Sequence, residues 1–180
     1  MEERYKVTKI VGIVGIIGNI FLLIIKGIIG TITKSQAMIA DSINSAGDIF
    51  ASIMTFIGNK IASVPKDENH NFGHGKAEYI FSLLISLSMI GVSLKMIVEA
   101  IIKLINGSEI IYSNWLIIVC IVTILIKLML YFYTKNKYKL CNNILLEASM
   151  KDHRNDCIIT TFTLISILLS IKGIYWVDSI

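Results

Sequence analysis

Two parts of the sequence carry oxygen-bearing side chains at the four-residue spacing that puts them on one face of a helix. Asn44 and Asp48 form one pair, and Asp152 and Asp156 form the other. With a rise of about 1.5 Å per residue, the two members of a pair lie about 6 Å apart along the helix, so both can reach one small object. Two such pairs facing each other would offer four oxygen ligands to a cation.

Further polar residues continue the face of each pair, as expected if both faces point away from lipid. They recur at spacings of three and four: Asp41, Ser45, Ser52 and Thr55 beside the first pair, and Thr160 and Thr163 beside the second. His153 is one residue out of register, about 100° around the helix, and we exclude it from the ligand set.

A structural role for these acids is the alternative interpretation. Interhelical hydrogen bonds and salt bridges could simply hold a bundle together, with Asp152 and Asp156 paired to Lys151 or Arg154. Against this, three carboxylates so close together repel one another unless a divalent ion or protons neutralise them. Matched pairs on two separate helices therefore favour a cation site.

A third group of candidate ligands follows the first acidic helix. Asp67, His70 and His74 lie in the sequence PKDENHNFGHGKAE, with glycines on both sides of the second histidine. Imidazole nitrogen and carboxylate oxygen suit zinc and similar divalent ions. A loop histidine is more often only solvated, but the adjacent acidic helix favours a capture site at the mouth of a cation pathway.

The elements that must position these residues are membrane helices. Of the 180 residues, 54% are hydrophobic and 17% are charged, with a mean hydropathy of +0.71, whereas soluble domains are about one quarter charged. The fold class is therefore all-α: a polytopic membrane helix bundle in which residues 1–180 form one transmembrane domain. Apolar runs of about 20 residues predict five complete helices and the start of a sixth, the complete ones at residues 7–31, 36–62, 76–105, 114–134 and 142–171.

Basic residues gather before the first helix and at alternate connections, which predicts a cytoplasmic membrane protein with a cytoplasmic N-terminus. The three groups are Arg4, Lys6 and Lys9; Lys60, Lys66 and Lys76; and Lys135, Lys137 and Lys139. This loop bias explains the net charge of +4 without a nucleic-acid partner.

Small residues and cysteines suggest packing and not chemistry. Gly12, Gly15 and Gly18 leave a smooth stripe on which another helix can pack closely. The three cysteines, Cys120, Cys141 and Cys157, show no CxxC pairing and are expected to be buried free thiols. A metal-dependent intramembrane hydrolase would need a HExxH-like motif or a nucleophile beside a base, and neither is found, so we expect no enzyme.

The motifs SQAMIADSINSAGD, PKDENHNFGHGKAEYI and DHRNDC together resemble the cation diffusion facilitator family of metal ion–proton antiporters. The resemblance covers nearly the whole chain. It implies a transport site at Asn44, Asp48, Asp152 and Asp156 and a cytoplasmic loop site at Asp67, His70 and His74.

The resemblance also indicates the cargo. Zinc-transporting members typically have histidine where this chain has Asn44 and Asp152, so one amide and three carboxylates are similar to the manganese-type branch. All-oxygen ligands shift the preference from zinc toward harder ions such as Mn²⁺, with Fe²⁺ and Zn²⁺ as alternatives. The metal is cargo, and no cofactor is expected.

Family members usually have six spanning helices and then a cytoplasmic domain that helps dimerisation. This sequence ends at Ile180, inside the expected sixth helix, so we expect a truncated transmembrane domain. The function expected for the intact form is secondary active Mn²⁺/H⁺ antiport by alternating access in a homodimer, with membrane lipid, a divalent metal ion and protons as partners. The alternative is a truncated, non-transporting membrane subunit whose acids are structural.

Overall fold

The structure is a computed structural model that describes residues 2–32, 36–65, 73–106 and 114–171. The described residues form five helices and no strand, which confirms the all-α prediction. The helices are α1 (Glu2–Ile32), α2 (Gln36–Ala62), α3 (Ala77–Asn106), α4 (Asn114–Cys141) and α5 (Ile144–Ile171). The start of a sixth helix was expected after residue 171 and lies outside the described residues.

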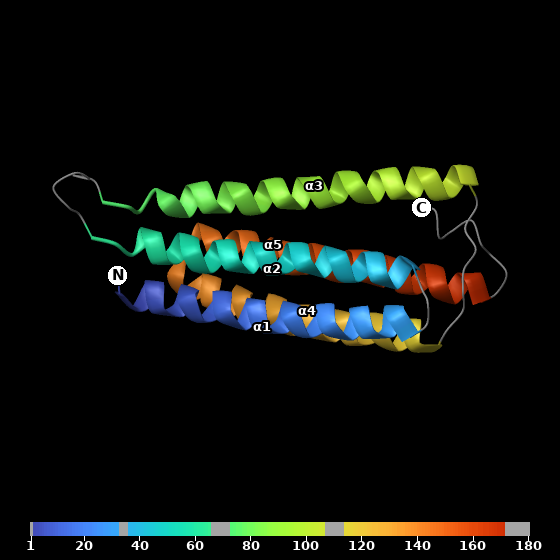
Figure 1. Cartoon of the computed structure of the whole chain (residues 1–180). Helices are drawn as coiled ribbons and strands as arrows, with labels where there is room; N and C mark the ends of the chain where they lie inside the picture. Colours follow the sequence, from blue (N-terminus) through green and yellow to red (C-terminus); the bar gives the residue numbers. More distant parts are fainter. Residues whose placement is uncertain (1, 33–35, 66–72, 107–113, 172–180) are drawn as a thin grey trace.

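The helices pack as three layers (Figure 1). The acidic helices α2 and α5 form the middle layer, α1 and α4 lie on one side of it, and α3 lies on the other. The middle layer thus holds the two helices whose polar faces carry the candidate ligands. The polar faces of α2 and α5 can therefore pack against neighbouring helices and avoid contact with lipid.

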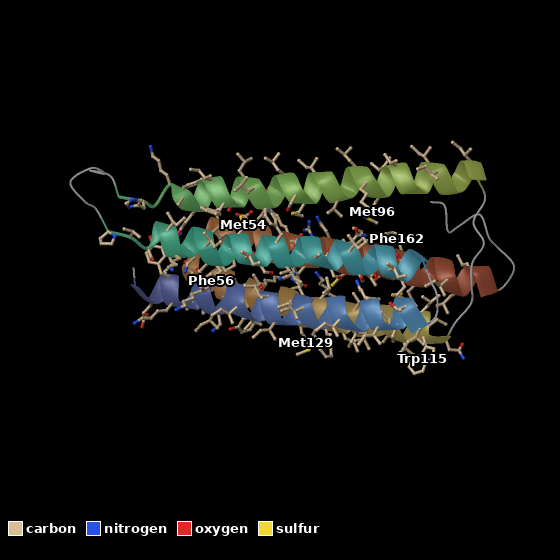
Figure 2. All side chains as sticks on the ribbon, in the orientation of Figure 1. Met54, Phe56, Met96, Trp115, Met129 and Phe162 are labelled. Atoms are coloured by element: carbon tan, nitrogen blue, oxygen red, sulfur yellow. The ribbon has the colours of Figure 1, made fainter. Side chains whose placement is uncertain are left out.

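Large apolar side chains cover the outside of the bundle, while polar residues such as Asn19, Thr55 and Thr123 are buried inside it. Figure 2 shows Met129 and Trp115 projecting outward from the bundle. This distribution suits a hydrocarbon solvent, and α1, α3 and α4 each contain a segment long and apolar enough to cross a membrane. The chain is therefore a multi-pass membrane protein.

The glycines of α1 lie where neighbouring helices come closest, as predicted. A Cβ at Gly12 would lie 3.2 Å from Phe56 of α2, and one at Gly15 would lie 2.8 Å from Ser52. Gly18 instead meets Leu130 of α4, at 3.1 Å. The stripe therefore serves two helix contacts, and it brings α1 close to the polar face of α2.

Helix α4 is longer than predicted: it ends at Cys141 and not near residue 134. Lys135, Lys137 and Lys139 therefore belong to its last turns and not to a loop. The ammonium groups of Lys135 and Lys137 lie 5.2 Å and 5.7 Å from the ring centres of the tyrosines four residues earlier. Such cation–π contacts at i, i+4 spacing favour continued helix in a polar sequence.

Only two residues join α4 to α5. Asn142 has a φ of 43°, a left-handed conformation that asparagine tolerates. Asn143 caps α5, because its Oδ1 accepts a hydrogen bond from the Leu145 backbone N–H at 2.8 Å. This turn lies at the same end of the bundle as the N-terminus and the α2–α3 connection (Figure 1). The basic residues of the three groups, apart from Lys66, which lies outside the described residues, are thus near one end of the bundle.

The cysteines are free thiols, as expected, although only Cys120 and Cys157 are buried. Cys141 is half-buried at the end of α4.

Candidate metal centre

Two of the predicted ligands, Asp48 and Asp156, meet at one cation in the centre of the bundle. That cation is the side chain of Lys127 on α4. Its Nζ donates to Asp48 Oδ2 at 2.8 Å and to Asp156 Oδ2 at 2.5 Å. Each of the three residues is near the middle of a helix of 27 or 28 residues, about 20 Å from the helix ends.

The lysine is more deeply buried than its partners. Its side chain is 1% exposed, compared with 17% for Asp48 and 23% for Asp156. A charge in the interior of a membrane protein is costly and is normally paired. The two carboxylates supply that pairing and draw α2, α4 and α5 together.

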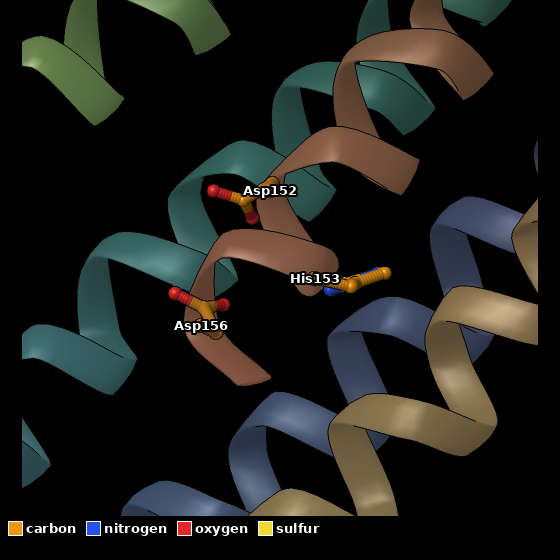
Figure 3. Close-up of side chains that lie close together, drawn as sticks. All are labelled: Asp152, His153 and Asp156. Atoms are coloured by element: carbon orange, nitrogen blue, oxygen red, sulfur yellow. The ribbon is translucent and has the colours of Figure 1, made fainter. Parts of the chain in front are cut away.

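The second acid of α5, Asp152, lies one turn before Asp156 and is buried. Figure 3 shows both aspartates directed toward α2. The third residue in this group, His153, offers a ring nitrogen within 4.8 Å of carboxylate oxygens of both aspartates. Its ring nevertheless lies on the side of α5 that faces α1 and α4 (Figure 3).

His153 is almost completely buried, and its Nδ1 has no hydrogen-bond partner in the described part of the chain. It is adjacent to the acidic cluster but does not share the face of the two aspartates. The register offset of about 100° accounts for this position.

The fourth predicted ligand, Asn44, makes a different contact. Its Oδ1 accepts a hydrogen bond from Lys95 Nζ of α3 at 3.1 Å. Asn44 lies one turn before Asp48 on the same face of α2. Its oxygen is therefore near the carboxylates along the helix but is held by a separate lysine.

Buried hydrogen bonds fix the acidic helices in place. Asn19 of α1 donates to the backbone oxygen of Asp48 at 3.2 Å and to Ser52 Oγ at 3.1 Å. Further along the same polar face of α2, Thr55 and Ser149 share a hydrogen bond of 2.7 Å that joins α2 to α5. These contacts set the rotation of α2 and thereby the position of the Asp48 side chain.

A second charged pair lies further along the polar face of α2. Lys26 of α1 contacts Asp41 Oδ2 at 2.9 Å and donates to Ser45 Oγ at 3.2 Å. Lys26 is buried, whereas the Asp41 side chain is 46% exposed. The polar face of α2 therefore meets lysines from three helices, at Asp41, Asn44 and Asp48.

The predicted loop site is described only in part. Asp67 and His70 lie outside the described residues. His74 lines a cavity of about 900 Å³ at the end of the bundle, together with Lys6, Lys9 and Lys60. The structure gives no geometry for the three ligands as a set.

Lys127 is a functional candidate that the sequence analysis did not name. Under the alternative interpretation the acids of α5 would pair with Lys151 or Arg154, and the structure gives these two residues other partners. Lys151 contacts Glu147 at 2.7 Å, and Arg154 donates to Asn155. The signal was present in the sequence: Lys127 is the only charged residue between Asn114 and Thr134. An isolated charge within a spanning segment is usually functional, and its partner should be sought on other helices.

Comparison with known proteins agrees with this architecture. Residues 12–180 match the model of the cation efflux transmembrane domain. The chain is 36% identical to an uncharacterized transporter of Methanocaldococcus jannaschii, over 91% of this chain and 58% of the relative. It is 31% identical to a manganese efflux system protein of Bacillus subtilis, over 95% of this chain and 57% of the relative.

A cation-efflux pump of Shewanella oneidensis is 29% identical over 88% of this chain and 54% of the relative. The chain thus spans little more than half the length of these curated relatives. The resemblance inferred from the three motifs is confirmed. Because the family model covers nearly all of the chain, the protein belongs to the cation efflux family of membrane transporters.

Proposed function

We propose that this chain forms the transmembrane part of a divalent metal exporter, with a transport site at Asn44, Asp48, Asp152 and Asp156. The observation that carries the proposal is the convergence of Asp48 of α2 and Asp156 of α5 on one positive charge near the middle of their helices. Carboxylates that share an ammonium are close enough to share a metal ion. Asp152 is one turn away and adds a third carboxylate to the same face of α5.

The cargo we propose is Mn²⁺, with Fe²⁺ and Zn²⁺ as alternatives. The site offers carboxylate and amide oxygens, which favour harder divalent ions. Relatives named as manganese efflux proteins support this choice, including a second one from Bacillus subtilis that is 32% identical over 87% of this chain.

The mechanism we propose is proton antiport by alternating access. Metal binding displaces protons from the aspartates, and rocking of the bundle exposes the site to the opposite side of the membrane. Protons then replace the metal there. Asn44 carries no proton in this cycle, because an amide does not titrate; it shapes the site.

The setting that goes with this mechanism is a cytoplasmic membrane, with the basic end of the bundle and the N-terminus in the cytoplasm. Asp67, His70 and His74 would form a capture site at that end. The intact form would be a homodimer.

One observation favours a second function, that of a non-transporting membrane subunit. Lys127 already pairs with Asp48 and Asp156, so the acids could serve only to join α2, α4 and α5. This alternative predicts no stoichiometric metal binding. The two functions are therefore separable by a binding measurement.

The experiment is a calorimetric titration of the purified protein with Mn²⁺, followed by Mn²⁺ uptake into proteoliposomes. We expect one bound ion per central site and time-dependent uptake, and we expect Asp156→Ala to abolish both. Glu147→Ala is the matched control, since Glu147 is an acid of the same helix that pairs only outside the site, with Lys151 and Tyr138. Absence of Mn²⁺ binding to the wild-type protein, or full binding by Asp156→Ala, would overturn the proposal.

A further inference from the structure

We propose that Lys127 is a resident counter-cation of the transport site, whose ammonium holds Asp48 and Asp156 until an incoming divalent ion takes those oxygens. The inference rests on the function proposed above and adds a positioning and specificity role for a residue of α4. The evidence is that Lys127 contacts oxygens of two of the proposed metal ligands. The oxygens that accept from Lys127, Oδ2 of Asp48 and Oδ2 of Asp156, belong to the two helices that carry the proposed metal ligands.

A metal ion and the ammonium cannot both use these oxygens in the observed arrangement. Carboxylate oxygens lie about 2.0–2.2 Å from a bound ion such as zinc, and Lys127 Nζ is 2.8 Å and 2.5 Å from the same two atoms. An ion placed between the carboxylates would be next to a second positive charge in a medium that screens charge poorly. The ammonium must therefore move when the metal binds.

The movement we propose for the Lys127 ammonium needs rotation of the side chain and not a change in the backbone. Lysine carries a point charge on a flexible four-carbon stem, so its ammonium can change partners by rotation about side-chain bonds. Asp152 offers an alternative partner, since its ligand oxygen lies within 4.8 Å of that of Asp156. The lysine can thus stay inside the cluster, with its ammonium on one oxygen of Asp152 while the other oxygen of that carboxylate remains available to the ion.

Charge balance explains why the lysine would be retained. Asp48, Asp152 and Asp156 carry three negative charges when ionised, and Lys127 carries one positive charge. A divalent ion brings the sum to zero, whereas a trivalent ion leaves the buried site with an excess positive charge. Because net charge inside a membrane protein is costly, Lys127 should favour divalent over trivalent ions.

The test compares Lys127→Met with Lys127→Arg in calorimetric titrations with Mn²⁺ and, separately, with La³⁺. Because Lys127→Met lacks the competing ammonium, it should bind Mn²⁺ about tenfold more tightly than the wild type and transport it more slowly in uptake assays, since release of the ion is slower. Its preference for La³⁺ over Mn²⁺ should rise about tenfold. Lys127→Arg keeps the charge, but its planar fork can hold two carboxylates at once. It should therefore bind Mn²⁺ about tenfold more weakly than the wild type.

Lys26→Met is the control for loss of a buried lysine. Lys26 is also buried and pairs with an aspartate of α2, but that aspartate is Asp41 and not a proposed ligand. Its Mn²⁺ affinity should stay within about twofold of the wild type, because Lys26 contacts Asp41 and Ser45 and none of the proposed ligands. If Lys127→Met does not fold, the sign of the Lys127→Arg effect decides the question.

The outcomes separate this inference from the proposed function. A wild-type protein that binds no Mn²⁺ would overturn the transport site. The other outcome has two parts. The wild-type protein binds Mn²⁺ and Asp156→Ala does not, while the Lys127 variants show Mn²⁺ affinities and La³⁺ preferences that are unchanged or change in the opposite directions. That outcome would overturn only the role of Lys127. In that case the lysine would be a structural link between α2, α4 and α5.

Discussion

Two charged clusters in the interior of this molecule both pair acidic with basic side chains, but they differ in the ratio of acids to bases. The end cluster consists of Arg4, Glu78, Asn143 and Thr8, and joins α1, α3 and the α4–α5 turn. The central cluster consists of Asp48, Asp152, Asp156 and Lys127, and joins α2, α4 and α5. The first contains one acid and one base, whereas the second contains three acids and one base.

The end cluster satisfies its single carboxylate from both sides. Glu78 Oε2 accepts from Arg4 Nη2 at 2.6 Å, and Glu78 Oε1 accepts from Asn143 Nδ2 at 3.2 Å. Asn143 also donates to Thr8 Oγ1 at 3.2 Å. The end cluster has one positive and one negative charge, and both carboxylate oxygens accept a hydrogen bond. It therefore links the helices at the basic end of the bundle.

The central cluster has one ammonium for three carboxylates. Lys127 contacts Asp48 and Asp156. The Asp152 side chain is also buried and forms no ion pair within the part of the chain that the structure describes. A buried group of charges that does not balance by itself is stabilised by an additional cation, whether metal ion or proton. The end cluster therefore joins helices, whereas we propose that the central cluster both joins helices and binds a metal ion.

The largest expected effect is on metal affinity in the central cluster. Asp156→Asn keeps the shape of the side chain and removes one anionic ligand, so Mn²⁺ affinity should fall by about 100-fold or more. Thermal unfolding of the metal-free protein should change much less, because Lys127 keeps its contact with Asp48. A calorimetric titration and a melting curve on the same preparation measure both. Retained affinity would place the metal elsewhere.

The next effect is on stability in the end cluster. Arg4→Met removes the cationic partner of Glu78, which is buried, and should lower the free energy of unfolding by about 3 kcal/mol. Mn²⁺ affinity should stay within about twofold, because the end cluster shares no residue with the central one. Equilibrium unfolding in detergent gives the first quantity. A large loss of Mn²⁺ affinity in a folded Arg4→Met protein would show that the two clusters are coupled.

A smaller effect is expected at the turn that leads into α5. Asn143→Ala removes the helix cap and the donor to Glu78 and Thr8, and should cost about 1–2 kcal/mol of stability. Its neighbour supplies the control. Asn142→Gly places glycine at a positive φ, which glycine adopts without strain, and should change stability by no more than about 0.5 kcal/mol. Equal losses in both variants would mean that the turn, and not the cap, is what matters.

Much of the architecture followed from local sequence. Helix α2 begins and ends where the apolar run and its polar flanks predicted, at residues 36–62, because length and hydropathy set the extent of a membrane helix. The glycine stripe of α1 and the shared faces of Asn44 with Asp48 and of Asp152 with Asp156 also follow from the sequence. They depend only on the 3.6-residue period of the helix.

Local sequence did not predict where α4 ends or which residues the buried charges contact. The lysine-rich end of α4 has polar composition and helical structure, so hydropathy alone placed the boundary two turns too early. Lys127 was visible in the sequence as a lone charge, but its contact with Asp48 and Asp156 joins residues 79 and 29 positions away. The same is true of Lys95 and Asn44, which are 51 positions apart.

The sequence by itself determined that the chain forms membrane helices and that two of them carry acids on one face. Only the tertiary structure decided which cation those acids meet, and that one lysine serves two of them. The physical reason is that helical periodicity relates residues within a segment, whereas the rotation and spacing of neighbouring helices depend on packing, as at Gly15 against Ser52, and on buried hydrogen bonds, as from Asn19 to Asp48.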